Sequence, residues 1–328
     1  MAATPFGQSL NLVGVLSESK RIISAHSRHF LALSVFFLLP LAFSLIIFPT
    51  LQTTLSHQSK PYHVNSLLRG AAAGSFPSIL FPLLYLLFVV VLSLSAVSTI
   101  TYSTFHGFYG RPVRLAAALK SMINSFLPLL LTAFASQIVE LLVCSAFGLF
   151  LGLVAKGLEL LGFHNVLDSK YFIIFCVVVL VALVLVLVHL QVNWALAPVV
   201  AVVESKWGFE PLRRSSYLVK GMRRVSFYLL LLFGVLIGFS VWINSTPSSG
   251  SFEDVWKCLN FVLQTVAGSS FLTLFMLYNV AANTVLYMYC KALNGELAWE
   301  IAEEFAREYV SLPFDDAKVP HVVFVAQA

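Results

Sequence analysis

Charged side chains are scarce in this chain of 328 residues. Asp, Glu, Lys and Arg make up 11% of it, whereas hydrophobic residues make up 59% and the mean hydropathy is +0.89. A soluble domain carries about a quarter charged residues, which keep it solvated. The composition therefore excludes a large soluble domain and predicts that much of the apolar surface faces lipid.

Motifs for catalysis and metal binding are also missing. The sequence has no HExxH, GxSxG or P-loop, and no GxGxxG after an expected strand. Its four cysteines show no CxxC or Cys/His spacing, and we interpret them as small buried hydrophobes. His26 and His29 are three residues apart without a carboxylate or cysteine cluster, which is typical of interfacial side chains. We expect no enzyme, no catalytic residue, no metal and no cofactor.

Long uncharged runs predict six membrane-spanning helices. A helix of about 20 apolar residues crosses about 30 Å of hydrocarbon, and only helices and closed barrels satisfy their backbone groups in lipid. The runs are too long for barrel strands. A leader (1–29) precedes the expected membrane domain (30–290), and a tail (291–328) follows it. We place the spans near residues 30–49, 78–102, 126–150, 171–194, 226–244 and 261–289.

The distribution of Lys and Arg predicts the orientation of these spans. Fifteen of the twenty lie before span 1, between spans 2 and 3, between spans 4 and 5, and after span 6. Cytoplasmic segments carry this excess, so we expect both termini in the cytosol, in the endomembrane system or the plasma membrane. The sequon at Asn244 then lies on the opposite side. It directly follows a span and precedes Pro247, and we expect it to stay unglycosylated.

Three segments share one layout, an amphipathic stretch that runs into an apolar span. They cover residues 16–37, 115–134 and 212–233, with Lys20, Lys120 and Lys220 in corresponding places. A period of about 100 residues indicates an internal repeat. Alternatively, any hairpin topology places basic helices before inward-starting spans. We predict an all-α membrane protein with six transmembrane helices in three hairpin repeats, each preceded by a cytosolic interfacial amphipathic helix.

The third of these segments is the most basic. On a helical wheel at about 100° per residue, Leu212, Leu218, Val219 and Met222 share one arc, and the opposite arc holds Arg213, Lys220 and Arg224. Such a helix lies in the membrane interface with its apolar arc toward the acyl chains. Each cation near an anionic leaflet contributes about 1 kcal/mol. The candidate headgroup-binding residues are Arg213, Arg214, Lys220, Arg223 and Arg224.

The same segment carries a family resemblance. The run VVESKWGFEPLRRSSYLVKGMRRVSFYLLLLFGVL resembles the signature of the membrane domain attached to some bacterial glycerophosphodiester phosphodiesterases, and FYGRPVRLAAALKSMINSFLPLL is similar to the preceding repeat of that family. The whole chain, particularly its end YMYCKALNGELAWEIAEEFAREYVSLPFDD, also resembles an uncharacterised plant family of six-span proteins. The phosphodiesterase barrel is absent, so the resemblance implies a membrane fold without that enzymatic activity.

Polar residues inside the expected spans are candidates for function because each is costly in hydrocarbon. Glu140 is the only formally charged residue deep in a span, and a pairing with His189 could relay protons or hold a cation. Alternatively, these groups hydrogen-bond the helices together, at about 0.6–2 kcal/mol each. The candidate intramembrane polar cluster consists of Gln137, Glu140, His189, Asn193, Asn279 and Asn283.

Two further segments are expected to lie at the cytosolic face. Tyr102, His106 and Tyr109, near Arg111 and Arg114, are typical of an aromatic and basic belt, and a lipid-headgroup pocket is the alternative. The acidic amphipathic stretch 296–312 is repelled by an anionic leaflet. We expect it to pack on the basic cytosolic helices, or else on a protein partner.

These features leave two functional hypotheses. The first is a non-enzymatic multi-pass membrane protein that organises membrane or partners through its basic interfacial helices and cytosolic tail. The alternative is a transporter or channel in which polar residues of spans 3, 4 and 6 line the path. A lipid enzyme lacks any catalytic signature. The expected partners are the bilayer, anionic headgroups of the cytosolic leaflet and a protein at the tail, with no nucleic acid.

Overall fold

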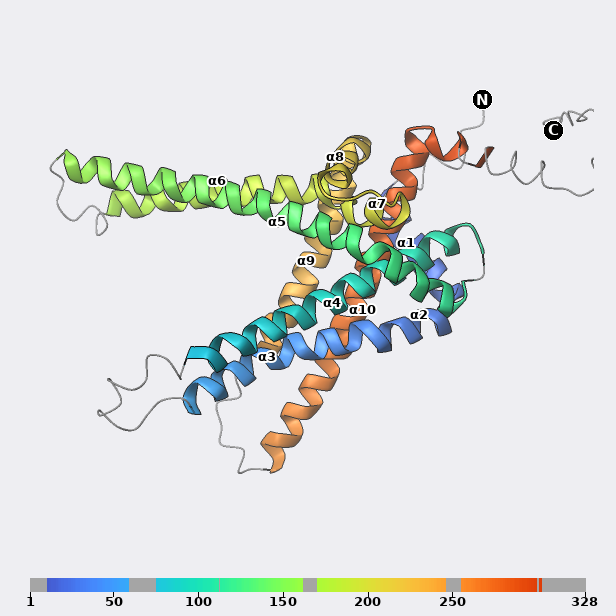
Figure 1. Cartoon of the computed structure of the whole chain (residues 1–328), viewed down its shortest axis with the longest axis horizontal. Coiled ribbons are helices and arrows are strands. Elements are labelled where there is room, and N and C mark those ends of the chain that lie inside the picture. Colours follow the sequence, from blue (N-terminus) through green and yellow to red (C-terminus); the bar gives the residue numbers. More distant parts are fainter. Residues whose placement is uncertain are drawn as a thin grey trace, which may run out of the picture.

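The computed structural model describes residues 11–58, 75–111, 113–161, 170–245, 255–299 and 301–302, and all regular elements in these ranges are helices (Figure 1). The N-terminal half contains α1 (Leu12–Ala25), α2 (Ser27–Leu33), the π-helical turn η2 (Ser34–Leu38), α3 (Leu39–Gln58), α4 (Ser75–Phe108) and α5 (Leu115–Leu160). The C-terminal half contains α6 (Lys170–Trp194), α7 (Ala197–Val203), α8 (Phe209–Leu218), the 3₁₀ turn η5 (Val219–Gly221), α9 (Arg223–Ser245) and α10 (Val255–Leu293).

Six helical stretches in the described ranges are long and apolar enough to cross a membrane. Their mean hydropathies lie between 1.5 and 3.5, and there is one stretch for each expected span. They cover Ser27–Pro49, Leu80–Phe108, Leu115–Leu160, Lys170–Val203, Arg223–Asn244 and Leu259–Leu293. The all-α fold with six candidate spans is therefore confirmed.

The long helices differ in how much protein surrounds them. α10 packs against α9, α3 and α4, and α4 packs against α5. Figure 1 shows α5 and α6 running side by side and projecting away from the other helices. In the most apolar window of α5 no residue is buried by protein, whereas 33% of the α10 window is buried. The α5–α6 pair is therefore the part of the bundle least covered by protein, and α10 is its central helix.

The main core lies where α1 and the α6–α9 region meet α10. It includes Phe30, Ile100, Leu196, Leu218 and Tyr287, each essentially inaccessible. The leader contributes to this core because α1 places apolar residues at helical spacing on one face. The described part of the leader, from residue 11, is therefore part of the folded bundle, with Lys20 and Arg21 on its exposed side.

The three segments of the expected repeat differ in local geometry. A turn at His26 separates α1 from α2, α5 runs without interruption from Leu115, and η5 separates α8 from α9. Lys20, Lys120 and Lys220 are all exposed. The hairpin repeat itself stays a prediction.

The apolar arc of the third segment faces protein. Leu212, Leu218, Val219 and Met222 are all buried against the bundle, so this arc does not lie free toward acyl chains as the wheel alone predicts. A helical wheel identifies an apolar face without identifying its neighbour, and here the neighbour is the core. The outer side of the segment instead exposes aromatic rings and cations.

Candidate functional site

At the break between α6 and α7, two serines from later in the chain form hydrogen bonds with backbone groups. Backbone groups at a helix end lack intrahelical partners and must find others, and Pro198 removes one further donor. The Ser215 hydroxyl, which is fully buried, donates to the carbonyl oxygen of Asn193 at 2.7 Å and accepts from the Leu196 N–H at 3.2 Å. Ser226 donates to the carbonyl oxygen of Val192 at 3.2 Å. These bonds satisfy the interrupted backbone and fix α8 and α9 against α6.

The loop between α7 and α8 adopts a conformation that few residues tolerate. Ser205 has a φ of +52° and Gly208 a φ of +70° with a ψ of −126°. The Gly208 combination is accessible essentially only to glycine, because a Cβ would collide with the backbone. The loop therefore holds a strained conformation that neighbouring contacts must maintain.

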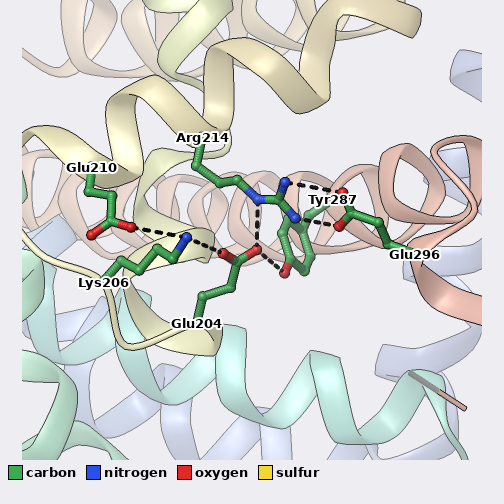
Figure 2. A network of polar contacts seen from close by, with 6 residues as sticks. All are labelled: Glu204, Lys206, Glu210, Arg214, Tyr287 and Glu296. Carbon is green, nitrogen blue, oxygen red and sulfur yellow. Dashed lines mark hydrogen bonds and ion pairs between the residues drawn. The ribbon is translucent and has the colours of Figure 1, made fainter. Parts of the chain in front are cut away.

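Glu204 supplies those contacts at the centre of a polar network (Figure 2). Its Oε1 accepts from the Tyr287 hydroxyl at 2.9 Å and from Arg214 Nε at 3.3 Å. Its Oε2 lies 3.4 Å from Lys206 Nζ, which also lies 3.1 Å from an oxygen of Glu210. The glutamate thus joins its own loop to α8 and to the buried ring of Tyr287 in α10.

Arg214 extends the network to the tail. Its Nη1 donates to Glu296 Oε1 at 3.1 Å, and its Nη2 donates to Glu296 Oε2, which makes a bidentate pair. Partial burial of the guanidinium lowers its pKa, but the hydrogen bonds to Glu296 and the charge of Glu204 outweigh this, so the pKa lies above its usual range. Arg214 stays protonated and bridges two carboxylates.

The beginning of the acidic tail is therefore docked on the bundle. Residues 296–299 and 301–302 are helical, Leu297 packs against the main core, and Glu296 binds Arg214. The rest of the predicted acidic helix, including Glu303, Glu304 and Glu308, lies outside the described residues.

The network separates the candidate headgroup-binding residues into two groups. The Arg214 side chain is only 22% exposed and is occupied by Glu204 and Glu296, so it is not free for a headgroup. The other four are exposed, and within the described ranges none of them pairs with a carboxylate: Arg213, Lys220, Arg223 and Arg224. We keep the headgroup prediction for these four.

Replacing Gly208 with alanine should destabilise the fold by about 1–3 kcal/mol, because alanine must adopt the same strained φ and ψ. Gly221→Ala is the matched control. Its φ is not positive, and a Cβ there would lie 3.7 Å from Leu293 Cδ1, an ordinary contact. Denaturant unfolding in mixed micelles should therefore separate the two variants. Equal losses of stability in Gly208→Ala and Gly221→Ala would contradict the assignment of backbone strain to position 208.

The intramembrane polar residues do not gather in one place. Glu140 Oε1 accepts a hydrogen bond from Gln191 Nε2 at 2.7 Å, and these two residues, with Gln137, line a cavity of about 250 Å³ between α4, α5 and the α6–α7 region. His189 is exposed and does not line this cavity. The expected pair of Glu140 with His189 is therefore not formed, and Gln191 is the partner.

The remaining members of the expected cluster form bonds within their own helices. Asn193 donates to the carbonyl oxygen of His189 at 2.9 Å. Asn283 donates to both the backbone oxygen and Oδ1 of Asn279, each at 3.0 Å. Neither asparagine of α10 lines the Glu140 cavity. Among the described residues, no group of three or more His, Cys, Asp and Glu side chains could hold a metal ion.

Asn244 is packed against a neighbouring helix. Its Nδ2 donates to the carbonyl oxygen of Ser240 at 2.7 Å, and a Cβ added at Gly268 of α10 would lie only 2.4 Å from its Oδ1. A glycan would have to displace this contact. That geometry supports the expectation that Asn244 stays unmodified, which remains a prediction, and Thr246 lies outside the described residues.

Six long apolar helices, joined at one end by buried serines and an ion-pair network, are the architecture of a multi-pass helical membrane protein. More specifically, the chain belongs to the family defined by a domain of unknown function, DUF8558, which matches residues 7–319. No curated protein and no solved structure matches the chain. The family description names no activity, so function must be argued from the geometry.

Proposed function

We propose that this chain is a non-enzymatic multi-pass membrane protein that organises anionic lipids beneath its α8 face. The observation that carries the proposal is that the segment around α8 has more cations than its carboxylates pair with. The three carboxylates there are engaged by two cations, Lys206 and Arg214. The four exposed cations of the same segment are left over for an external anion: Arg213, Lys220, Arg223 and Arg224. Lipid phosphates are the anions nearest to such a surface in a membrane.

Aromatic rings beside these cations support a position at the headgroup level. Trp207, Phe209 and Tyr217 are all exposed, and the Tyr217 ring centroid lies 5.8 Å from Lys220 Nζ. Amphipathic rings concentrate at membrane interfaces, and Lys and Arg lay their methylene stems along apolar surface while the charge reaches the headgroups.

The predicted orientation places this face in the cytosol. The count of fifteen Lys and Arg residues against five favours a cytosolic position for both termini and for α8. The cytosolic leaflet is the anionic one, which agrees in sign with the four exposed cations. The resemblance to a bacterial membrane domain and to a plant six-span family supports the same fold and implies no catalytic activity. The docked tail remains available as a surface for a protein partner.

The lipid proposal is tested by measuring lipid enrichment. In nanodiscs of mixed phosphatidylcholine and phosphatidylserine, we expect the protein to be enriched in phosphatidylserine, because each cation contributes about 1 kcal/mol. A variant with Arg213, Lys220, Arg223 and Arg224 all replaced by glutamine should lose most of this enrichment. High salt should lower it in the wild type.

The matched control carries the same substitution at Lys156 and Lys170, two exposed lysines of the distant α5 and α6 ends. This control should keep the enrichment of the wild type. An unenriched wild type, or an α8 variant that behaves as the control does, would contradict the proposal.

Transport is the alternative function, and Glu140 tests it. Of the candidate intramembrane polar cluster, Gln137 and Glu140 line the Glu140 cavity, whereas His189, Asn193, Asn279 and Asn283 do not. Its other polar lining includes Gln191 with the hydroxyls of Ser93, Thr132 and Ser136, and the Gln191–Glu140 hydrogen bond joins α6 to α5, which favours a helix contact over a path. We expect proteoliposomes to show no ion flux above protein-free vesicles. Glu140→Gln retains a hydrogen-bonding side chain and should change the free energy of unfolding by less than about 1 kcal/mol. A flux that Glu140→Gln abolishes would replace the lipid proposal with transport.

A further inference from the structure

A second polar cavity lies on the same side of the bundle as the α7–α8 loop. It has a volume of about 500 Å³ and is bounded by α4, the first turns of α5, the end of α7 and Ser205. Its polar lining includes His106, Lys120, Ser121, Asn124, Ser125 and Ser205. Tyr102 and His106 of the expected aromatic and basic belt line this cavity, whereas Tyr109, Arg111 and Arg114 do not.

Ser121 and Ser125 differ from the later serines of α5. Serines in helices commonly donate to a carbonyl one turn earlier, as Ser136 and Ser145 of the same helix do. Ser125 is only 6% exposed and forms no hydrogen bond within the described part of the chain. The Ser125 hydroxyl is therefore available to a hydrogen-bond partner that enters the cavity.

Ser205 is unusual among the residues of the cavity. Its positive φ is uncommon outside glycine, and such strain is typical of binding sites when neighbouring contacts maintain it. Here the preceding residue, Glu204, is fixed by Arg214, Lys206 and Tyr287. The ion-pair network therefore holds one rim of the cavity in place.

The charge of the cavity lining favours an anionic ligand. Lys120 is exposed, and no carboxylate belongs to the lining. Its ammonium group, the Asn124 amide and the serine hydroxyls are donors that suit phosphate oxygens. Ile123 and Leu127, on the outer face of the same helix, are exposed apolar residues against which an acyl chain can lie.

We propose that this cavity binds the phosphate of an anionic phospholipid, with Lys120 as its counter-ion and with Asn124, Ser125 and Ser205 as hydrogen-bond partners. The proposal rests on the proposed position of this end of the bundle at the lipid headgroups. It adds a saturable site for one lipid. The exposed cations between residues 213 and 224 do not line this cavity and do not form that site.

The experiment measures binding of short-chain phosphatidic acid to the full-length protein in a zwitterionic detergent. We expect one saturable site, and Lys120→Ala should weaken binding about tenfold, as expected for a lost charged hydrogen bond. Ser125→Ala should also weaken binding, yet leave thermal stability unchanged, because the Ser125 hydroxyl forms no hydrogen bond within the described part of the chain. Arg114→Ala, at an exposed residue just before α5 and outside the cavity, is the matched control and should bind as the wild type does.

Two further ligands identify the source of the phosphate. If glycerol 3-phosphate binds as tightly as phosphatidic acid, the acyl chains contribute nothing and the lipid assignment is overturned. If short-chain phosphatidylcholine binds as tightly as phosphatidic acid, the preference for an anionic lipid is overturned. Equal affinities of Lys120→Ala and Arg114→Ala would overturn the site itself. The glutamine variant of the four exposed cations between residues 213 and 224 should retain this saturable site. A failure here is therefore distinguishable from a failure of the proposed lipid enrichment.

Discussion

Arg214→Ala is expected to destabilise the protein by about 3 kcal/mol, the largest loss for any single charged residue in the described chain. The substitution removes the bidentate pair with Glu296 and the bond to Glu204, and it leaves two partly buried carboxylates without their common cation. The same change should release the tail from the bundle, because Glu296 has no other ion-pair partner in the described ranges. Denaturant unfolding in mixed micelles measures the loss, and limited proteolysis after Lys291 reports the release.

Arg213→Ala is the matched control for this prediction. The residue is adjacent, carries the same side chain and is exposed without a carboxylate partner, so its effect should stay within about 0.5 kcal/mol. A double-mutant cycle between Arg214 and Glu296 should give a coupling energy of at least about 1 kcal/mol. Similar losses for both arginine variants would show that the network does not stabilise the fold.

Ser215→Ala is expected to cost about 3 kcal/mol although it removes a single oxygen atom. The hydroxyl serves both the Asn193 carbonyl and the Leu196 N–H at the α6–α7 break. Each buried backbone group left unpaired costs about 1–3 kcal/mol. Ser216→Ala is the control, since Ser216 bonds only the Arg213 carbonyl of its own helix at an exposed position. A tolerated Ser215→Ala would mean that water or backbone movement replaces the hydroxyl.

The long apolar helices were predictable because lipid imposes a requirement that is local in sequence. A span needs about 20 consecutive apolar residues whatever its neighbours are, and six uncharged runs meet that requirement. The break in the fourth span was less visible. Trp194 and Ala197 lie in one continuous apolar run, and the serine that closes the break is about twenty residues away in the sequence.

The polar pairs were not predictable because they depend on which helices touch and at which rotation. Gln191 follows His189 by two residues, which turns its side chain by about 200° around the helix. Only one of the two can face α5, and it is Gln191 that reaches Glu140. Likewise, the helical wheel places Arg213 opposite the apolar arc and leaves Arg214 off that side, but no neighbouring residue distinguishes Arg214 as an ion-pair partner. The partner that does so, Glu296, lies 82 residues later.

The ion-pair network and the two proposed lipid contacts belong to one face of the molecule. Arg214 and Lys206 neutralise the carboxylates of the loop and tail, which fixes the α7–α8 loop and leaves the outer cations unpaired. The same loop holds Ser205 at the rim of the Lys120 cavity. Both proposed lipid contacts therefore require this face to lie at an anionic leaflet, which in a cell is the cytosolic one.

The most direct test of this requirement is protease protection in sealed vesicles whose cytosolic side faces outward. One epitope tag is placed after Ala328 and another after Leu161, at the α5 end far from α8. We expect that added protease removes the C-terminal tag and that the Leu161 tag stays protected until detergent opens the vesicles. A protected C-terminus with a cleaved Leu161 tag would place the basic face away from the anionic leaflet and contradict the account.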